Sequence, residues 1–194
     1  MACNAAILAG GDSFRMGCEK AFIELEGKSL IRRTLDTLAP LFPRLMIISN
    51  RVGRYDSLGV PVYPDRVPDK GPLGGIYTAL SRSADPVFVV ACDMPFLNPD
   101  LIRYLLDRFK GHDAALFRSP DGSHPLHAVY SPSILPVIEE NLLKGYIKIT
   151  RLLERIDRIE ISTDEVRAID PAGKFLTNLN TPEELAKARG RALN

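Results

Sequence analysis

Two adjacent glycines, Gly10 and Gly11, follow the apolar run Asn4 to Leu8, and two cations, Arg15 and Lys20, come shortly after them. Glycine permits positive φ angles and lets a ligand approach the backbone closely. Successive backbone N–H groups in such a loop can cradle phosphate oxygens. Arginine can bind a phosphate with two parallel hydrogen bonds, and lysine adds a point charge. This spacing therefore predicts a loop that holds a nucleoside triphosphate.

Two better-known phosphate-binding motifs are absent from this loop. The P-loop requires GxxxxGK followed by Ser or Thr, whereas Gly17 is followed by Cys18, and the dinucleotide pattern GxGxxG is missing. An ordinary strand-to-helix turn would explain a lone pair of glycines. The addition of Arg15-Met16-Gly17 and Lys20 favours phosphate binding.

A carboxylate follows the most apolar run of the chain, Val87 to Ala91, after one intervening residue, Cys92. In an open α/β sheet, ligands bind beyond the carboxyl ends of the strands, so Asp93 would lie at the edge of the site. Carboxylate oxygens suit Mg²⁺, which also bridges phosphates, and we therefore predict Asp93 as a metal ligand. The alternative is that Asp93 caps a turn before Pro95. A nucleophilic role for Cys92 is rejected, because no base lies near it in the sequence and free cysteine is usually buried.

Two polar residues follow other predicted strands. Asp65 comes after Val60 to Tyr63, and its carboxylate could accept hydrogen bonds from a base or a ribose; alternatively it is a loop aspartate in a charged stretch with Arg66. Asn50 comes after Leu45 to Ser49, where it could contact the base edge or serve equally well as the N-cap of the next helix.

The segment Gly71-Pro72-Leu73 opens a predicted helix that continues to Ser83. The N–H groups and dipole at this helix start could face the nucleotide. Pro72 also has a structural explanation, because proline is favoured in the first helical turn.

Near the carboxyl end, Asn178 and Asn180 are two residues apart, so on an extended chain both face the same side. Thr181, Pro182 and Glu184 then form the start of a last helix, with the spacing of a capping box. Capping explains these three residues but leaves the paired asparagines for another role.

Short apolar runs alternate with amphipathic segments along the chain, which predicts an α/β fold: a three-layer, doubly wound, mostly parallel sheet. No break in composition divides the chain, so we expect one domain, 1–194, with a nucleotide-binding half (1–110) and an acceptor-binding half (111–194). The predicted strands are 4–8, 45–49, 60–63, 87–91, 114–117 and 127–130, and the predicted helices are 29–38 (capped by Ser29), 73–83, 99–110 (capped by Asn98), 132–143 and 181–192.

The composition is that of an ordinary globular protein. Its 25 basic and 24 acidic residues give a net charge of +1, which provides no general reason to expect nucleic acid or membrane binding. Three widely spaced cysteines argue against a disulfide framework or zinc site. There is no secretory signal pattern and no apolar run long enough to span a bilayer, so we expect a cytoplasmic protein.

The pattern Leu-Ala-Gly-Gly-x-Ser-x-Arg-Met-Gly-x-x-Lys resembles the signature of the molybdenum cofactor guanylyltransferases, members of a Rossmann-like nucleotidyltransferase fold. The resemblance implies GTP and molybdenum-molybdopterin as substrates and Mg²⁺ as cofactor. Arg15, Lys20 and Asp93 would then be catalytic, with Asp93 the magnesium ligand and Asp65 a guanine contact. The GTP site would comprise Leu8, Ala9, Gly10, Gly11, Lys20, Asn50, Asp65, Gly71, Pro72, Leu73 and Asp93.

The same resemblance places the acceptor in the second half of the chain. His124 precedes Pro125-Leu126, in the place where the family carries a polar residue before Pro-Leu, although a lone histidine in a turn is more often simply solvated. Lys148 lies where the family has a basic residue, and Asn178 and Asn180 match its pterin-side segment. We also expect a monomer or weak homo-oligomer that meets the proteins inserting and delivering the cofactor.

Two other functions remain open from sequence. A sister enzyme would use CTP or a sugar phosphate; Gly10-Gly11, in place of Ala-Gly or Ala-Ala, favours the guanylyl branch. A non-catalytic nucleotide-binding regulatory protein would need neither Lys20 nor Asp93, and both are present.

Overall fold

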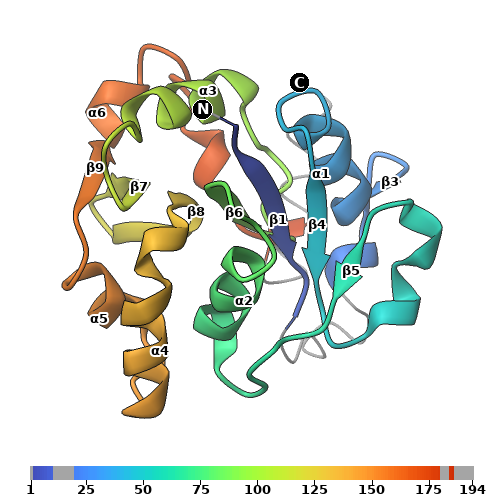
Figure 1. Ribbon diagram of the computed structural model, residues 1–194. Coiled ribbons are helices and arrows are strands. Elements are labelled where there is room, and N and C mark those ends of the chain that lie inside the picture. Colours follow the sequence, from blue (N-terminus) through green and yellow to red (C-terminus); the bar gives the residue numbers. More distant parts are fainter. Residues whose placement is uncertain (1, 11–19, 180–183, 186–194) are drawn as a thin grey trace.

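The computed structural model describes residues 2–10, 20–179 and 184–185, and within them one sheet has seven strands in the order β5-β4-β1-β6-β8-β7-β9 (Figure 1). Gly11, Arg15, Asn180 and most of the predicted last helix lie outside the described residues. The strands are β1 (Asn4–Leu8), β4 (Leu45–Ile48), β5 (Val62–Tyr63), β6 (Val87–Ala91), β7 (Ala114–Ser119), β8 (Gly122–Tyr130) and β9 (Arg158–Ser162).

The strand directions agree with the predicted, mostly parallel sheet. β5, β4, β1 and β6 are mutually parallel, β8 is antiparallel to both β6 and β7, and β9 is parallel to β7. The prediction of an α/β fold with a mostly parallel sheet is therefore confirmed. Because Val90 pairs with His127, the first residues of β8 reach the edge at which β6 ends.

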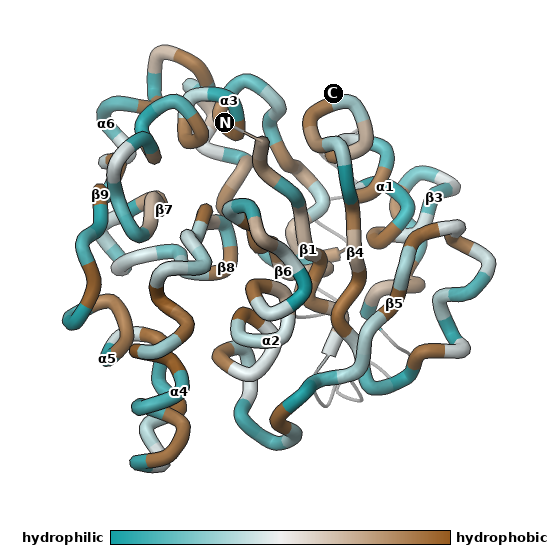
Figure 2. The backbone as a smooth tube through the Cα atoms, in the orientation of Figure 1, coloured by the Kyte–Doolittle hydropathy of each residue, from teal (hydrophilic) through white to brown (hydrophobic). Residues whose placement is uncertain are grey.

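Helices cover both faces of the sheet, which explains the continuous apolar character of the central strands. On β6, Phe88 and Val90 pack with α1 (Leu30–Leu38) and α3 (Pro99–Arg108), whereas Val87 and Val89 pack with α2 (Gly71–Leu80), α4 (Leu135–Leu143) and α5 (Ile149–Leu153). Figure 2 shows hydrophobic segments along β4 and hydrophilic ones in the loop between β5 and α2. Among the described helices, none has the length and apolar character needed to cross a membrane.

The helix starts match the predictions to different degrees. Asn98 caps α3 as predicted: its Oδ1 accepts hydrogen bonds from the backbone N–H groups of Asp100 (2.9 Å) and Leu101 (3.3 Å). Ser29 precedes α1, but its side chain forms no capping hydrogen bond within the described residues. It belongs instead to a small hairpin of β2 (Glu24–Leu25) and β3 (Lys28–Ser29), which the sequence reading missed.

Other differences lie mainly in the second half. The predicted strand 127–130 extends back to Gly122, and the predicted helix 132–143 begins as a 3-10 turn, η5 (Pro132–Ile134). β9, α5 and the short capped helix α6 (Thr163–Val166) were not predicted. Short 3-10 turns also occur at η2 (Lys20–Phe22), η3 (Val52–Arg54), η4 (Asp56–Leu58) and η6 (Lys174–Leu176).

Candidate functional site

The carboxyl ends of four parallel strands lie level at one edge of the sheet. Leu8 at the end of β1 pairs with Ile48 of β4 and with Ala91 of β6, and Ile48 pairs with Tyr63 of β5. The residues that follow these ends therefore start from the same edge. They are the residues predicted to bind the nucleotide: Ala9-Gly10, Asn50, Asp65 and Asp93.

Two hydrogen bonds hold Ala9, the residue that follows β1. The backbone N–H of Ala9 donates to the carbonyl of Ile48 (3.0 Å), and the phenol of Tyr55 donates to the carbonyl of Ala9 (3.2 Å). The next residue, Gly10, is exposed, and a Cβ added there would meet no described atom within 4 Å. Packing against the described residues thus does not require glycine at this position, whereas close approach of a ligand to the backbone would.

Lys20 and Asp93 meet at this edge. The Nζ of Lys20, on η2, lies 3.4 Å from Oδ2 of Asp93, and the two side chains are 16% and 17% exposed. The contact joins the segment after β1 to the segment after β6. This ion pair is shielded from water. A phosphate could take the place of Asp93 beside Lys20, and a cation could take the place of Lys20 beside Asp93.

The second oxygen of Asp93 fits a metal ligand. Oδ1 is buried and has no hydrogen-bond partner among the described residues, an unfavourable state for a carboxylate that a bound cation would relieve. The described residues contain no cluster of three or more acidic, histidine or cysteine side chains suited to a metal. Mg²⁺ is commonly bound by one or two carboxylates together with substrate phosphates and water, so Asp93 is compatible with it.

Asn50 and Asp65 are joined across the strand ends. Oδ1 of Asn50 accepts a hydrogen bond from the backbone N–H of Asp65 at 2.8 Å. Burial raises the pKa of the Asp65 carboxyl, and its Oδ1 is buried without a partner among the described residues. The alternative of Asn50 as a helix N-cap is wrong, because Arg51 occupies that position before η3.

The start of α2 lies close to the end of β1. Gly71 and Pro72 are exposed, whereas Leu73 is fully buried in the core, so that only its backbone could face a nucleotide. A Cβ added at Gly75 would lie 3.1 Å from the side chain of Leu8. This glycine therefore lets α2 approach β1 closely, a packing role that the sequence reading did not assign.

Part of the predicted acceptor side also reaches Asp93. The backbone N–H of Leu179 donates to the carbonyl of Asp93 at 2.9 Å, which brings the exposed Asn178 beside it. His124 lies near the start of β8 with its Nε2 2.9 Å from Oγ of Ser119, and burial lowers its pKa. It is thus not the simply solvated histidine that the sequence also allowed.

Lys148 stands apart from these contacts. It is exposed and directly precedes α5, and no hydrogen bond or ion pair joins its side chain to the other predicted residues that the structure describes. Its assignment to the acceptor stays a prediction.

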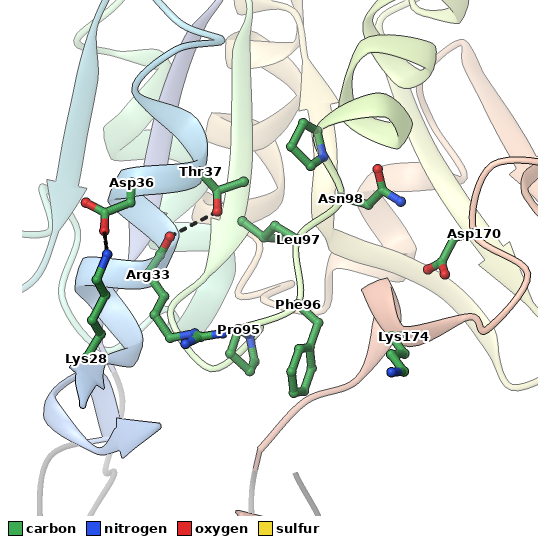
Figure 3. A pocket seen from close by; sticks show the side chains of 11 residues that line it. Lys28, Arg33, Asp36, Thr37, Pro95, Phe96, Leu97, Asn98, Asp170 and Lys174 are labelled. Carbon is green, nitrogen blue, oxygen red and sulfur yellow. Dashed lines mark hydrogen bonds and ion pairs between the residues drawn. The ribbon is translucent and has the colours of Figure 1, made fainter. Parts of the chain in front are cut away.

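A cavity of about 620 Å³ lies between α1 and the segment after Asp93 (Figure 3). Two of its cations, Lys28 and Arg33, are already paired, because Lys28 contacts Asp36 at 2.8 Å and Arg33 contacts Glu26 at 2.9 Å. The lining contains none of the predicted site residues that the structure describes, so the candidate site stays at Lys20 and Asp93. The cavity is lined by Lys28, Arg33, Asp36, Thr37, Pro95, Phe96, Leu97, Asn98, Pro99, Asp170 and Lys174.

Comparison with known proteins gives this geometry a context. The profile of the MobA-like NTP transferase domain matches residues 5–159. The chain belongs to this family. As a MobA-like NTP transferase it is a nucleotidyltransferase, and the parallel strand ends with Lys20 and Asp93 are its candidate site.

Relatives of this MobA-like chain match over nearly their whole length. A probable molybdenum cofactor guanylyltransferase of Pelotomaculum thermopropionicum is 38% identical over 98% of this chain and 94% of its own. A molybdenum cofactor guanylyltransferase of Syntrophotalea carbinolica is 35% identical over 96% and 90%. The crystal structure of molybdopterin-guanine dinucleotide biosynthesis protein A from Archaeoglobus fulgidus superposes with a TM-score of 0.86 at 28% identity, covering 98% of both chains.

Two contacts at the site were missed from the sequence. The hydrogen bond from Leu179 to Asp93 joins backbone atoms, so the residue types give no indication of it. Tyr55 left a weak signal, because it is the one aromatic residue in the stretch Arg51 to Ser57, which contains two arginines, an aspartate and a serine. An isolated aromatic of this kind often marks a buried anchor.

Proposed function

We propose that the chain transfers GMP from GTP to molybdenum-molybdopterin, forming the molybdopterin guanine dinucleotide cofactor and releasing pyrophosphate. The observation that carries the proposal is the Lys20–Asp93 contact at 3.4 Å, at the sheet edge where Asp65 also lies. The names of the two relatives support the acceptor and the nucleotide, because both match almost the entire chain.

Asp65 supports guanine as the base. A carboxylate only accepts hydrogen bonds, and guanine presents N1–H and N2–H₂ side by side as donors. Cytosine offers one amino group beside two acceptors, which a carboxylate would leave unsatisfied. Because burial raises the pKa of Asp65, donors from guanine would stabilise its charged form. Asn50 holds this segment in place through the backbone N–H of Asp65.

The reaction would be a direct in-line displacement. An oxygen of the acceptor's terminal phosphate attacks the α-phosphorus, a new P–O bond forms, and the bond to the bridging oxygen of the β-phosphate breaks to release pyrophosphate. Arg15 and Lys20 would hold the triphosphate and neutralise charge on the leaving group. Asp93 would hold Mg²⁺, which supplies charge neutralisation for the phosphates. A phosphate monoester is already anionic near neutral pH, so the protein needs no general base.

The acceptor would lie on the side of Asp93 reached by the second half of the chain. Asn178 is carried there by the Leu179 backbone, and Asn180 is expected beside it. His124 has a lowered pKa and would act as a neutral hydrogen-bond partner. Lys148, which is exposed, would contribute positive charge.

The test combines the purified protein, Mg²⁺, molybdenum-molybdopterin and each of the four nucleoside triphosphates in turn, with pyrophosphate release as the readout. We expect release with GTP. We also expect Asp65→Asn to reduce turnover with GTP while its far-UV circular dichroism spectrum stays that of the wild type. Release with CTP in place of GTP would move the chain to the cytidylyl branch. Nucleotide binding without release by any triphosphate would contradict the proposed transfer.

A further inference from the structure

Tyr55 is a buried residue in an exposed segment. It is 0% exposed, whereas its neighbours from Arg51 to Arg54 and at Asp56 and Ser57 are exposed. It lies between η3 and η4, where its backbone N–H donates to Val52 (3.1 Å) and its carbonyl accepts from Leu58 (2.9 Å). The backbone N–H and carbonyl of Tyr55 are thus both hydrogen-bonded, and its side chain extends into the interior.

The side chain of Tyr55 contacts both flanks of the glycine-rich segment. Its hydroxyl donates to the carbonyl of Ala9 (3.2 Å), the residue directly before Gly10. Its ring centroid lies 5.3 Å from that of Phe22, which belongs to the same short turn as Lys20. One buried aromatic residue therefore touches the chain immediately before the predicted phosphate loop and immediately after it.

We propose that Tyr55 is a positioning residue for nucleotide binding, which sets the carbonyl of Ala9 and the turn carrying Lys20 relative to each other. The inference rests on the proposed binding of a nucleoside triphosphate by the glycine-rich segment. The N–H of Ala9 donates to Ile48 of β4 and its carbonyl accepts from Tyr55, so the Tyr55 hydroxyl fixes the orientation of the peptide that leads into Gly10. Backbone N–H groups bind phosphates well only when their direction is set in advance.

Tyr55→Phe removes the hydroxyl and keeps the ring contact with Phe22. Tyr130→Phe is the matched control: Tyr130 is also 0% exposed, and its hydroxyl also donates to a backbone carbonyl, that of Pro125 at 2.8 Å. Both variants lose one hydrogen bond from a buried tyrosine hydroxyl to a backbone carbonyl and should lose similar stability. Only Tyr55→Phe should alter nucleotide binding.

The measurement is the Kd of each of the four nucleoside triphosphates with Mg²⁺, followed by KM and kcat with the one that binds the wild type best. We expect Tyr55→Phe to raise Kd and KM for the nucleotide about tenfold, equivalent to about 1.4 kcal/mol, with a smaller change in kcat. Tyr130→Phe should leave the nucleotide Kd within twofold of wild type. A Kd for Tyr55→Phe within twofold of wild type, or an equal rise in both variants, would overturn the proposal.

Amide hydrogen exchange tests the same inference without any nucleotide. Peptides covering Ala9 to Phe22 should exchange faster in Tyr55→Phe and at the wild-type rate in Tyr130→Phe, and unchanged exchange in Tyr55→Phe refutes the positioning role. If the wild type prefers a triphosphate other than GTP, the proposed base is wrong while the role of Tyr55 is still tested with the preferred nucleotide. If none of the four binds, the proposed function fails and hydrogen exchange alone decides on Tyr55.

Discussion

His127 places an ionisable group at the centre of an aromatic cluster. The side chain is 0% exposed, and its ring contacts those of Phe88, Phe117 and Phe175 edge-on, at centroid distances of 5.4, 5.0 and 5.7 Å. Neither ring nitrogen has a hydrogen-bond partner within the described part of the chain. Burial, assisted by the nearby His124, lowers the pKa of His127 from 6.5 to about 3.

This shift makes stability depend on pH in a definite direction. The folded state keeps His127 neutral, whereas the unfolded chain takes up a proton below pH 6.5. The associated stability is therefore complete above about pH 6.5 and is lost as the pH falls toward about 3. Each pH unit in that window costs about 1.4 kcal/mol, so that moving from pH 7.5 to 5.0 should cost about 2 kcal/mol from this residue.

His127→Leu removes the ionisable group while keeping an apolar side chain of similar size. Urea unfolding followed by circular dichroism at pH 7.5 and 5.0 gives the free energy of unfolding of each protein at each pH. We expect the variant to lose about 2 kcal/mol less than the wild type between the two pH values. A control variant, His112→Asn, changes a half-buried histidine paired with Asp157 and should leave most of the wild-type pH dependence in place. Equal losses in wild type and His127→Leu would refute the reasoning.

Three further outcomes follow from contacts at the site and at a helix start. Asp93→Asn should lower kcat by roughly 100-fold or more with a native circular dichroism spectrum, and wild-type-like turnover at ordinary magnesium would remove Asp93 from the reaction. Lys20→Ala should bind Mn²⁺ more tightly than the wild type in the absence of nucleotide, as measured by electron paramagnetic resonance. In the wild type, Lys20 lies 3.4 Å from the Asp93 carboxylate and competes with the cation for it. Lys28→Ala, whose lysine is paired with Asp36 instead, should not bind Mn²⁺ more tightly, and equal affinities in the two variants would contradict the competition. Asn98→Ala should lower the free energy of unfolding by about 1 kcal/mol in urea titrations through loss of the α3 cap, and no loss would show that the cap is replaced.

The parts of the fold that the sequence predicted are those with strong local signals. Val87 to Ala91 is an apolar run buried on both faces, and its bounds match β6. Asn98 followed by Pro99 is a local capping pattern that needs no tertiary context. By contrast, Arg158–Ser162 alternates charged and apolar residues at the sheet edge, and the short β2–β3 hairpin turns at Glu26-Gly27, both with positive φ but without the asparagine that usually marks such a turn.

The same distinction applies to the candidate site. Asp65 and Asp93 could be predicted as neighbours of one edge because parallel strands bring their carboxyl ends together. The Lys20–Asp93 distance and the role of Tyr55 could not, because both depend on contacts between residues far apart in sequence. Lys148 was placed by resemblance alone, and its exposed position before α5 gives it no independent support.

The antiparallel pairing of β8 with β6 has a consequence for how this enzyme can change. Residues 111–194 are not a detachable module, because they supply β8, the strand that completes the backbone hydrogen bonds of β6. A chain cut near residue 110 would leave β6 as an open, apolar edge that invites pairing with other chains. Any exchange of residues 111–194 between relatives therefore has to keep β8 in register with β6. Substitutions in the loops and strand ends leave that pairing unchanged.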